Sequence, residues 1–274
     1  MKFNLLPIIL IFFVLILFNS CEKEIDINLN ASNPKFVIEG NISNVFSEAK
    51  IKITKTLNFN ETIDYPLVSG AMVTITDSTM NVTDTLFESI KGLYTKQQLM
   101  GKEGHTYIMS VKIGTETFTA SSTMPYRLKL DSIIQQNLAG TASSFGPPAG
   151  TPAAGSIIQL LPEYLNTAHT DKFFQFIVLR NDSILNRINL RADLGSNSTN
   201  FSIPFPLFVR AKKDDTVTID LQFIDKNVYN YLYGLSQNLN QFSASPSNPT
   251  TNITNGALGY FSAHTSQKET LIIK

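Results

Sequence analysis

The stretch TYIMSVKIG, at residues 106–114, is typical of a half-buried β-strand that ends at a turn. Apolar and polar residues alternate along it, which makes one face of the strand apolar, and Gly114 closes it. The stretch KIKITK at residues 50–55 alternates in the same way. Five further strand-like runs lie at residues 36–40, 71–76, 82–87, 92–95 and 116–121. This density of short strands predicts a β-sandwich over residues 35–126.

The second half of the chain carries strand signals less regularly. Its runs lie at residues 128–134, 156–161, 172–180, 201–210, 216–224, 259–263 and 270–273. Two prolines within residues 201–210 favour an edge or bulged strand there. One helix is predicted over residues 228–239, because five apolar residues share one helical face: Val228, Tyr231, Leu232, Leu235 and Leu239.

The predicted fold class is therefore all-β. An N-terminal immunoglobulin/prealbumin-like β-sandwich precedes a second, mostly-β domain at residues 127–274 with one short helix. Residues 139–155 are rich in Gly, Pro, Ala and Ser and show no periodicity, which predicts a long exposed loop. Phe145 is the large apolar residue of that loop, and we expect it to contact a partner. A neutral insertion is the alternative.

The N-terminus has the order of a lipoprotein signal peptide. Lys2 precedes the apolar residues 5–18, a run too short for a comfortable membrane span but suited to a signal peptide. Ser20 and Cys21 then resemble a lipobox, although Phe18 and Asn19 depart from its strict pattern. We predict a signal peptide at residues 1–20 and lipidation at Cys21. A buried cysteine beside an uncleaved anchor helix is the alternative.

An acidic tether is predicted at residues 21–34, because Glu22, Glu24 and Asp26 follow the cysteine directly. It resembles a surface-export signal of Bacteroidota lipoproteins, and a solvated linker is the plainer interpretation.

The composition of the whole chain bears on two classes of protein, nucleic-acid-binding proteins and disulfide-stabilised proteins. Lys plus Arg and Asp plus Glu both total 22, which argues against nucleic-acid binding. The single cysteine excludes a disulfide scaffold.

No residue pattern predicts a catalytic, cofactor or metal site. The histidines, His105, His169 and His264, lie far apart in the sequence. Residues 77–88 have the spacing of a calcium-binding loop, but Val82 stands where such a loop needs glycine, so a strand is the better interpretation. The chain has no tryptophan, which lowers the expectation of glycan binding, although nine tyrosines could substitute.

Five segments resemble the Bacteroidota O-glycosylation signal, in which Asp precedes Ser or Thr and then an aliphatic residue or Thr. Each is equally a good turn into a strand. The candidate acceptors are Ser78, Thr85, Ser132, Ser183 and Thr216.

Several short motifs together resemble one protein family. They are CEKEID at 21–26, PKFVIEG at 34–40, SGAMVTITD at 69–77, GLY at 92–94, GHTY at 104–107 and NITNGALGYF at 252–261. Their order is similar to that of the Bacteroidota lipoprotein family catalogued as domain of unknown function 4249, over essentially the whole mature chain. The resemblance implies an accessory lipoprotein, often encoded beside TonB-dependent outer-membrane receptors, with no established catalytic residues.

The expected function is that of a non-enzymatic, lipid-anchored outer-membrane accessory protein that works with a TonB-dependent receptor in nutrient or ligand uptake. Display on the cell surface is expected, with the periplasmic face as the alternative. A surface glycan-binding lipoprotein of a polysaccharide-utilisation system is the second hypothesis. A hydrolase with an unrecognised site is the third.

Overall fold

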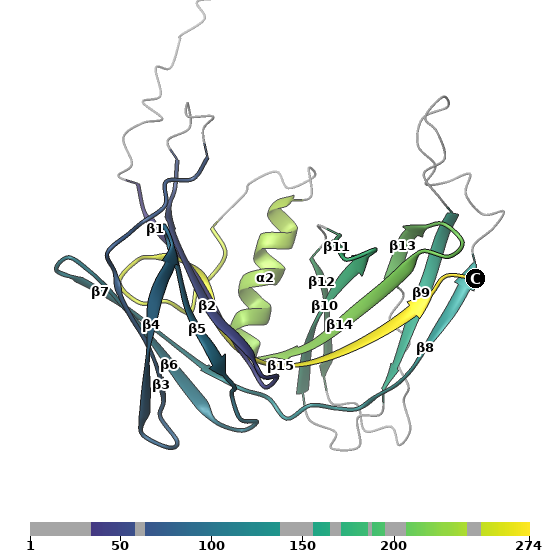
Figure 1. Ribbon diagram of the computed structural model, residues 1–274, viewed down its shortest axis with the longest axis horizontal. Helices are drawn as coiled ribbons and strands as arrows, with labels where there is room; N and C mark the ends of the chain where they lie inside the picture. Colours follow the sequence, from purple (N-terminus) through teal and green to yellow (C-terminus); the bar gives the residue numbers. More distant parts are fainter. Residues whose placement is uncertain are drawn as a thin grey trace, which may run out of the picture.

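The computed structural model describes residues 34–57, 64–137, 156–164, 171–185, 188–194, 207–239 and 248–274. Within them the chain forms β-strands and one helix, α2 (Lys226–Leu239), as Figure 1 shows. The all-β prediction with one short helix is confirmed. The predicted signal peptide, Cys21 with its tether, and the loop at 139–155 lie outside the described residues.

The N-terminal half is a β-sandwich of two sheets that meet at one strand. Buried residues such as Ile51 from one sheet and Met109 from the other fill the space between them. The start of β4 pairs with β3 and its end pairs with β5, so β4 passes from one sheet into the other. The strands are β1 (Phe36–Ser43), β2 (Ser47–Lys55), β3 (Met72–Asp77), β4 (Val82–Ile90), β5 (Leu93–Leu99), β6 (Thr106–Ile113) and β7 (Glu116–Thr123).

The C-terminal end of the chain completes this first sandwich. The strand β15 (Leu258–Ile272) lies parallel to β1, with Gly40 opposite Phe261. A side chain at position 40 would begin 2.9 Å from the Phe261 ring, so glycine is needed for the ring to enter the core. Ile253 also joins this core, and it bridges to Ala120 of β7. The sandwich predicted at residues 35–126 therefore also contains residues from the C-terminal end.

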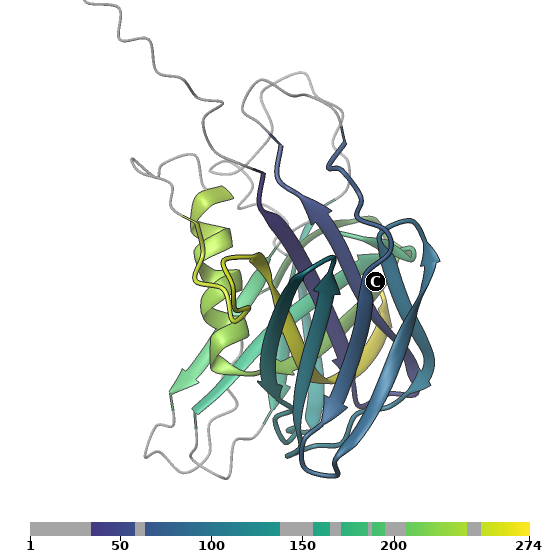
Figure 2. The ribbon, with the colours of Figure 1, turned by 90° about the vertical axis from the view of Figure 1, so that its left-hand side faces the viewer.

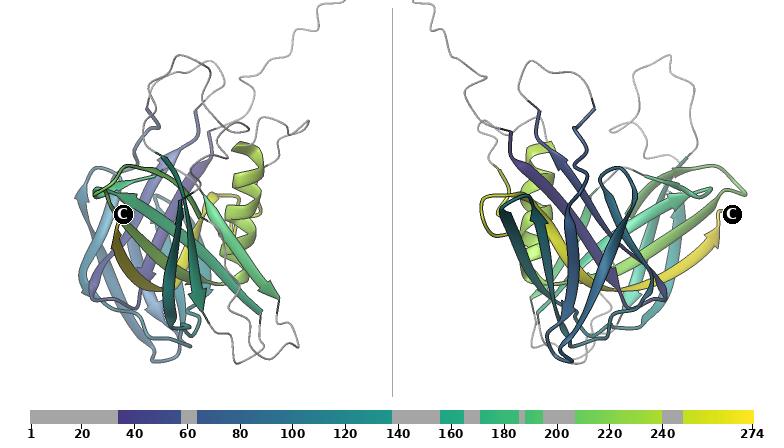
Figure 3. Two further views of the ribbon diagram at one scale, coloured as in Figure 1. Left: turned by 90° about the vertical axis from the view of Figure 1, so that its right-hand side faces the viewer. Right: turned by 60° about the vertical axis from the view of Figure 1, so that its left-hand side comes forward.

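A second sandwich follows the first, as Figure 3 shows. Its larger sheet has the order β11-β10-β14-β15, with β12 also paired to β10, and its smaller sheet has the order β13-β9-β8. Buried residues such as Phe176 and Leu160 pack between the two sheets. The strands are β8 (Leu130–Asn137), β9 (Ser156–Tyr164), β10 (Asp171–Arg180), β11 (Ser183–Ile184), β12 (Asn189–Leu194), β13 (Leu207–Ala211) and β14 (Thr216–Ile224).

Strand β15 belongs to both sandwiches. It pairs with β1 up to His264 and with β14 from Thr265 onward, and Figure 3 shows it running from one half of the molecule into the other. The sequence pattern predicts two short strands, at residues 259–263 and 270–273, with a polar segment between them. That separation is wrong, because the polar segment is itself part of the strand.

The helix α2 covers the face of the larger sheet that points away from the second core. Val228, Tyr231 and Leu232 are buried there against Phe173 and Ile224, as the predicted apolar face requires. Figure 1 shows α2 between the two halves of the molecule. No helix among the described residues is both long enough and apolar enough to cross a membrane.

The start of α2 is tied to both sandwiches through Asp225. Its Oδ1 accepts the Val228 N–H at 2.9 Å, which caps the helix, and its Oδ2 accepts the Ser122 hydroxyl of β7. The Ser122 oxygen in turn accepts the Ala263 N–H of β15 at 2.9 Å. Burial raises the pKa of Asp225, although these hydrogen bonds oppose the shift.

Candidate functional site

Four loops gather at one end of the first sandwich, at residues 44–46, 78–81, 100–105 and 124–129, and we call them the loop face. Strand β1 leads into this face, and its other end begins beside Lys35, whose N–H donates to Thr56 Oγ1. Eight extended residues separate these ends by about 26 Å. The loop face therefore lies at the end of the sandwich opposite the first described residue, as Figures 1 and 2 show.

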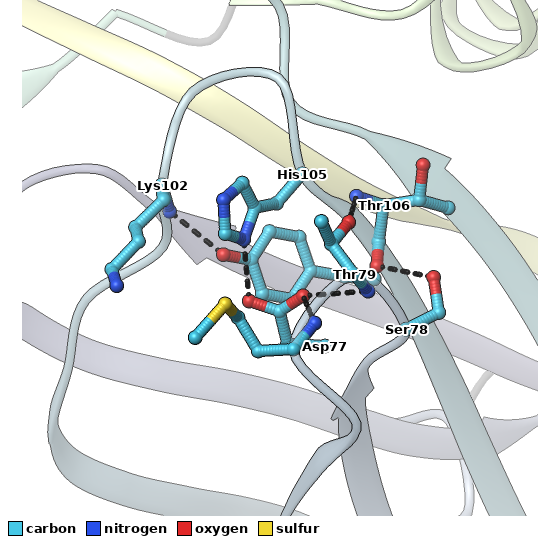
Figure 4. A network of polar contacts seen from close by, with 8 residues as sticks. Asp77, Ser78, Thr79, Lys102, His105 and Thr106 are labelled. Carbon is cyan, nitrogen blue, oxygen red and sulfur yellow. Dashed lines mark hydrogen bonds and ion pairs between the residues drawn. The ribbon is translucent and has the colours of Figure 1, made fainter.

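A hydrogen bond between the Asp77 carboxylate and the His105 ring holds two of these loops together (Figure 4). Asp77 Oδ2 lies 2.7 Å from His105 Nδ1, and Asp77 Oδ1 accepts the N–H groups of Thr79 and Met80 at 3.0 and 3.1 Å. Burial alone would raise the pKa of Asp77, but the hydrogen bonds from His105 and the two amides outweigh it and hold the pKa below its ordinary value. The carboxylate therefore fixes the 78–81 turn in its charged form.

The loop at residues 100–105 is fixed mainly through its backbone. The Lys102 N–H donates to the Tyr107 hydroxyl at 2.7 Å, and the Gly101 N–H donates to the Ser43 carbonyl at 2.8 Å. Gly104 has a φ of 81°, and a side chain there would begin 2.4 Å from the Tyr126 hydroxyl oxygen. Only glycine satisfies both conditions, and this lets Tyr126 lie directly against the loop.

Glu103 connects three of the four loops. Its Oε1 accepts the Asn44 side-chain amide at 3.4 Å and lies 3.3 Å from Arg127 Nε, while its Oε2 accepts the Arg127 N–H at 3.2 Å. Among the described residues, both of these carboxylates have a nitrogen-bearing partner: Asp77 has His105 and Glu103 has Arg127. Lys102 and Lys129 are exposed and form no ion pair with another described residue.

Large apolar side chains are exposed on this rigid frame. Phe46 is 68% exposed and Tyr126 is 66% exposed. Removing such large apolar side chains from water would be energetically favourable. The complete set on the loop face is Val45, Phe46, Met80, Met100 and Tyr126. Each of the four loops thus contributes at least one exposed large apolar side chain.

A second polar cluster, which we call the seam, lies where β15 passes between the sandwiches. Asp220 accepts the Ser266 hydroxyl at 2.6 Å and the Gln222 side-chain amide at 3.0 Å. His264 Nδ1 lies 3.2 Å from the Ser262 hydroxyl, and burial lowers the pKa of His264 to about 4 although nearby Asp220 opposes the shift. These side chains are buried, so the seam holds strands together and is closed to an external substrate.

The sequence-predicted residues fall in several places. Ser78, Thr85, Ser132 and Ser183 are exposed, whereas Thr216 is half-buried. The Ser132 hydroxyl donates to Glu163 at 2.5 Å, and the Ser78 hydroxyl donates to the Thr106 carbonyl at 2.9 Å. Cys21, His169 and Phe145 lie outside the described residues.

The calcium-like spacing at residues 77–88 forms a turn followed by β4, so the strand interpretation is confirmed. Asp77 and Glu88 do not come together, since Glu88 accepts hydrogen bonds from Ser69 and Gly92 at the other end of the strand. In the described part of the chain, no group of three or more His, Cys, Asp or Glu side chains could hold a metal ion.

The loop face itself was not predicted from the sequence. Asp77 and His105 are far apart along the chain, and Phe46 and Tyr126 lie in separate short segments between strands. A usable signal was present in the glycines, because GKEG at residues 101–104 predicts a tight loop. Which other loops it contacts depends on the strand order.

These features define a class: an all-β protein of two sandwiches that share one strand, with a rigid, partly apolar loop face at one end. The chain matches the family described as domain of unknown function DUF4249 over residues 22–270, and it therefore belongs to that family. No curated protein matches it. Among solved structures, a two-domain fibronectin type-III segment of chicken tenascin is similar at 7% identity and a TM-score of 0.23, with 88% of this chain and 99% of that chain covered.

Proposed function

We propose that this protein is a non-enzymatic, lipid-anchored accessory protein of the outer membrane that works with a TonB-dependent receptor in ligand uptake. The observation that carries the proposal is the order of segments along the chain: apolar residues 5–18, the single cysteine Cys21, and a β-sandwich whose described part starts at Pro34. Lipid on Cys21 would place a folded binding body at the membrane surface.

A binding role rather than catalysis is supported by what the polar side chains do. The carboxylate of Asp77 is occupied by His105 and two backbone amides, and His264 is buried within the seam. The exposed Phe, Tyr and Met side chains of the loop face suit recognition of another macromolecule, because these residue types are enriched at interfaces.

Two experiments test the proposal. Labelling cells with a palmitate analogue should mark the wild-type protein and leave Cys21→Ala unmarked; equal labelling of both would contradict lipidation. Purification of the tagged wild-type protein from solubilised outer membranes should recover a TonB-dependent receptor, and recovery of none would contradict the accessory role.

The membrane face is tested through the acidic tether. Replacement of Glu22, Glu24 and Asp26 by alanine should reduce protease accessibility on intact cells while total protein stays constant. Unchanged accessibility would make the tether a solvated linker.

Glycan binding is a second candidate, favoured by exposed rings at Tyr126 and at Tyr233 of α2. Tyrosine rings can stack on sugars as tryptophan does. A glycan array probed with the purified soluble body separates the candidates, since saturable binding that Tyr126→Ala or Tyr233→Ala abolishes would favour a glycan ligand.

A further inference from the structure

We propose that Asn255 is a site of spontaneous deamidation, in which its side-chain amide is converted to a carboxylic acid without an enzyme. The proposal does not depend on the proposed function, because it concerns a turn that belongs neither to the loop face nor to the seam. Three observations carry it: the residue that follows Asn255, the open surroundings of the turn, and the fixed segments on either side of it.

The turn is formed by the only Asn-Gly pair in the sequence, Asn255 and Gly256. Their φ angles are 58° and 75°, and Asn followed by Gly is the pair that best suits a tight turn with two left-handed residues. Both residues are exposed. Water, which is the second reactant in deamidation, therefore reaches the turn directly.

The reaction begins when the Gly256 backbone nitrogen attacks Cγ of the Asn255 side chain. A bond forms between these two atoms, the bond from Cγ to Nδ2 breaks, and the proton of the Gly256 N–H passes to the leaving nitrogen, which departs as ammonia. Water then opens the resulting succinimide ring at one of its two carbonyl carbons. The products are aspartate, with the original main chain, and isoaspartate, in which the main chain runs through the side chain and is one carbon longer.

The surroundings of Gly256 permit this attack. Apart from its chain neighbours, no heavy atom lies within 4 Å of the position that a side chain at residue 256 would occupy, so the peptide has room to rotate toward Cγ. Neither the Asn255 side chain nor the Gly256 N–H forms a hydrogen bond with another described residue. Because the reacting atoms lie in adjacent residues, the attack is intramolecular and needs no encounter between molecules.

Two other asparagines separate the effect of the next residue from that of the turn. Asn81 has a φ of 56° and is exposed, but it is followed by Val82, whose branched side chain crowds the attacking nitrogen. Asn181 has a φ of 47° and is also exposed, but its amide donates to Asp215 at 2.9 Å and its Oδ1 accepts the Thr216 N–H at 2.9 Å. We therefore expect both side chains to remain amides.

The isoaspartyl product disturbs the closure of the first sandwich. Ile253 and Ala257, on the two sides of the turn, are buried in its core. The Thr254 N–H donates to the Thr119 carbonyl at 2.8 Å, and the Thr254 hydroxyl accepts the Thr119 N–H at 3.0 Å. A main chain that is one carbon longer does not fit a tight turn between these fixed points, so the contacts on either side of it are loosened.

The test follows the full-length protein, purified in detergent, during incubation at mildly alkaline pH in water enriched in heavy oxygen. Peptide mass spectrometry measures deamidation at each asparagine, and the heavy oxygen marks reaction that occurs during the incubation. We expect the rate at Asn255 to exceed the rates at Asn81 and Asn181 by roughly tenfold, because attack is favoured only there. Equal rates at the three residues, or an unmodified Asn255, would overturn the proposal.

Two variants exchange the residue that supplies the attacking nitrogen. Gly256→Ala should slow the reaction at Asn255, and Val82→Gly should accelerate it at Asn81. Alanine is strained at the φ of Gly256, so Val82→Gly, at an exposed position, decides the matter if the first variant does not fold. An unchanged rate at Asn81 in Val82→Gly would contradict control of the reaction by the next residue.

Thermal unfolding tests the consequence for the sandwich. Incubated wild-type protein should melt at a lower temperature than fresh protein, in proportion to the isoaspartate that electron-transfer fragmentation detects. Asn255→Gly is the matched control, because it has no amide to lose and glycine accepts the same φ, so its melting temperature should not change on incubation. An unchanged melting temperature of wild-type protein rich in isoaspartate would refute the loosened closure.

Discussion

The loop face and the seam each contain a histidine near an aspartate, but they use these residues in opposite ways. At the loop face, His105 lies against a charged Asp77 that is held partly open to water. In the seam, burial keeps His264 neutral, and it contacts a serine rather than the carboxylate of Asp220. Burial rather than residue type therefore decides whether such a pair orders surface loops or holds strands together.

The largest expected effect is acid destabilisation through the seam. The pKa of His264 is about 4 in the folded protein and near its ordinary 6.5 in the unfolded chain. The unfolded chain therefore binds the proton first as the pH falls from about 6.5 to 4, so stability is lost across that window. Urea unfolding at about pH 7 and pH 4.5 should show a loss of roughly 2–3 kcal/mol from this group.

The control for this prediction is His264→Gln, which does not titrate. The variant should lose less stability than the wild-type protein over the same pH range, and the difference between the two isolates the histidine from carboxylates such as Asp77. Equal losses in both proteins would show that His264 is not held neutral by burial, and the contrast between the seam and the loop face would disappear.

A smaller effect is expected where the two sandwiches meet α2. Asp225→Ala removes the helix cap and the acceptor for Ser122, and should cost about 1–2 kcal/mol of unfolding free energy. Asp225→Asn should cost less, because it keeps an acceptor for Val228 and removes a charge that burial disfavours. Chemical unfolding of the two variants checks the order, and a larger loss for the asparagine variant would contradict it.

The loop face should respond in binding more than in stability. His105→Ala removes one hydrogen bond near the surface and should cost about 1 kcal/mol, because water replaces much of the interaction. Partner recovery should nevertheless fall several-fold, since the side-chain link between Asp77 and the loop at residues 100–105 is lost. Thr218→Ala, which removes the exposed Thr218–Thr270 hydrogen bond in the second sandwich, is the control for stability without loss of binding.

The smallest effect on the fold is expected from O-glycosylation. Four of the five predicted acceptors are exposed, so sugars there would not disturb either core. The intact mass of native protein should exceed that of peptide plus lipid, and replacement of the acceptor serines and threonines by alanine should remove the excess without changing the melting temperature. A native mass equal to peptide plus lipid would remove this prediction.

Much of the fold could be predicted because burial on one face leaves a simple alternation in the sequence. Residues 106–113 and 216–224 were predicted with the bounds that β6 and β14 have. The short strands β11 and β12 were missed, although polar and apolar residues alternate along residues 189–194. That alternation covers only six residues, β11 has only two, and both strands pair with β10.

The centre of β15 could not be predicted for a different physical reason. Residues 262–269 read as a polar loop, with serines, a histidine, a lysine and a glutamate. The strand forms because distant residues satisfy these groups: Asp220 accepts from Ser266, and Asn44 accepts the Ser266 N–H at 2.8 Å. The loop face could not be predicted from the sequence for the same reason, since its four loops come together only through the order of the strands in the sheets.

The sharing of β15 also has a kinetic consequence. Contacts between Gly40 and Phe261 join residues near the two ends of the chain, so the first sandwich acquires its last strand only after almost the whole chain is available. Such distant contacts slow folding, because a long loop must close before they form. For a chain that crosses a membrane from its N-terminus, this delay would keep the first half translocation-competent until the C-terminal residues emerge.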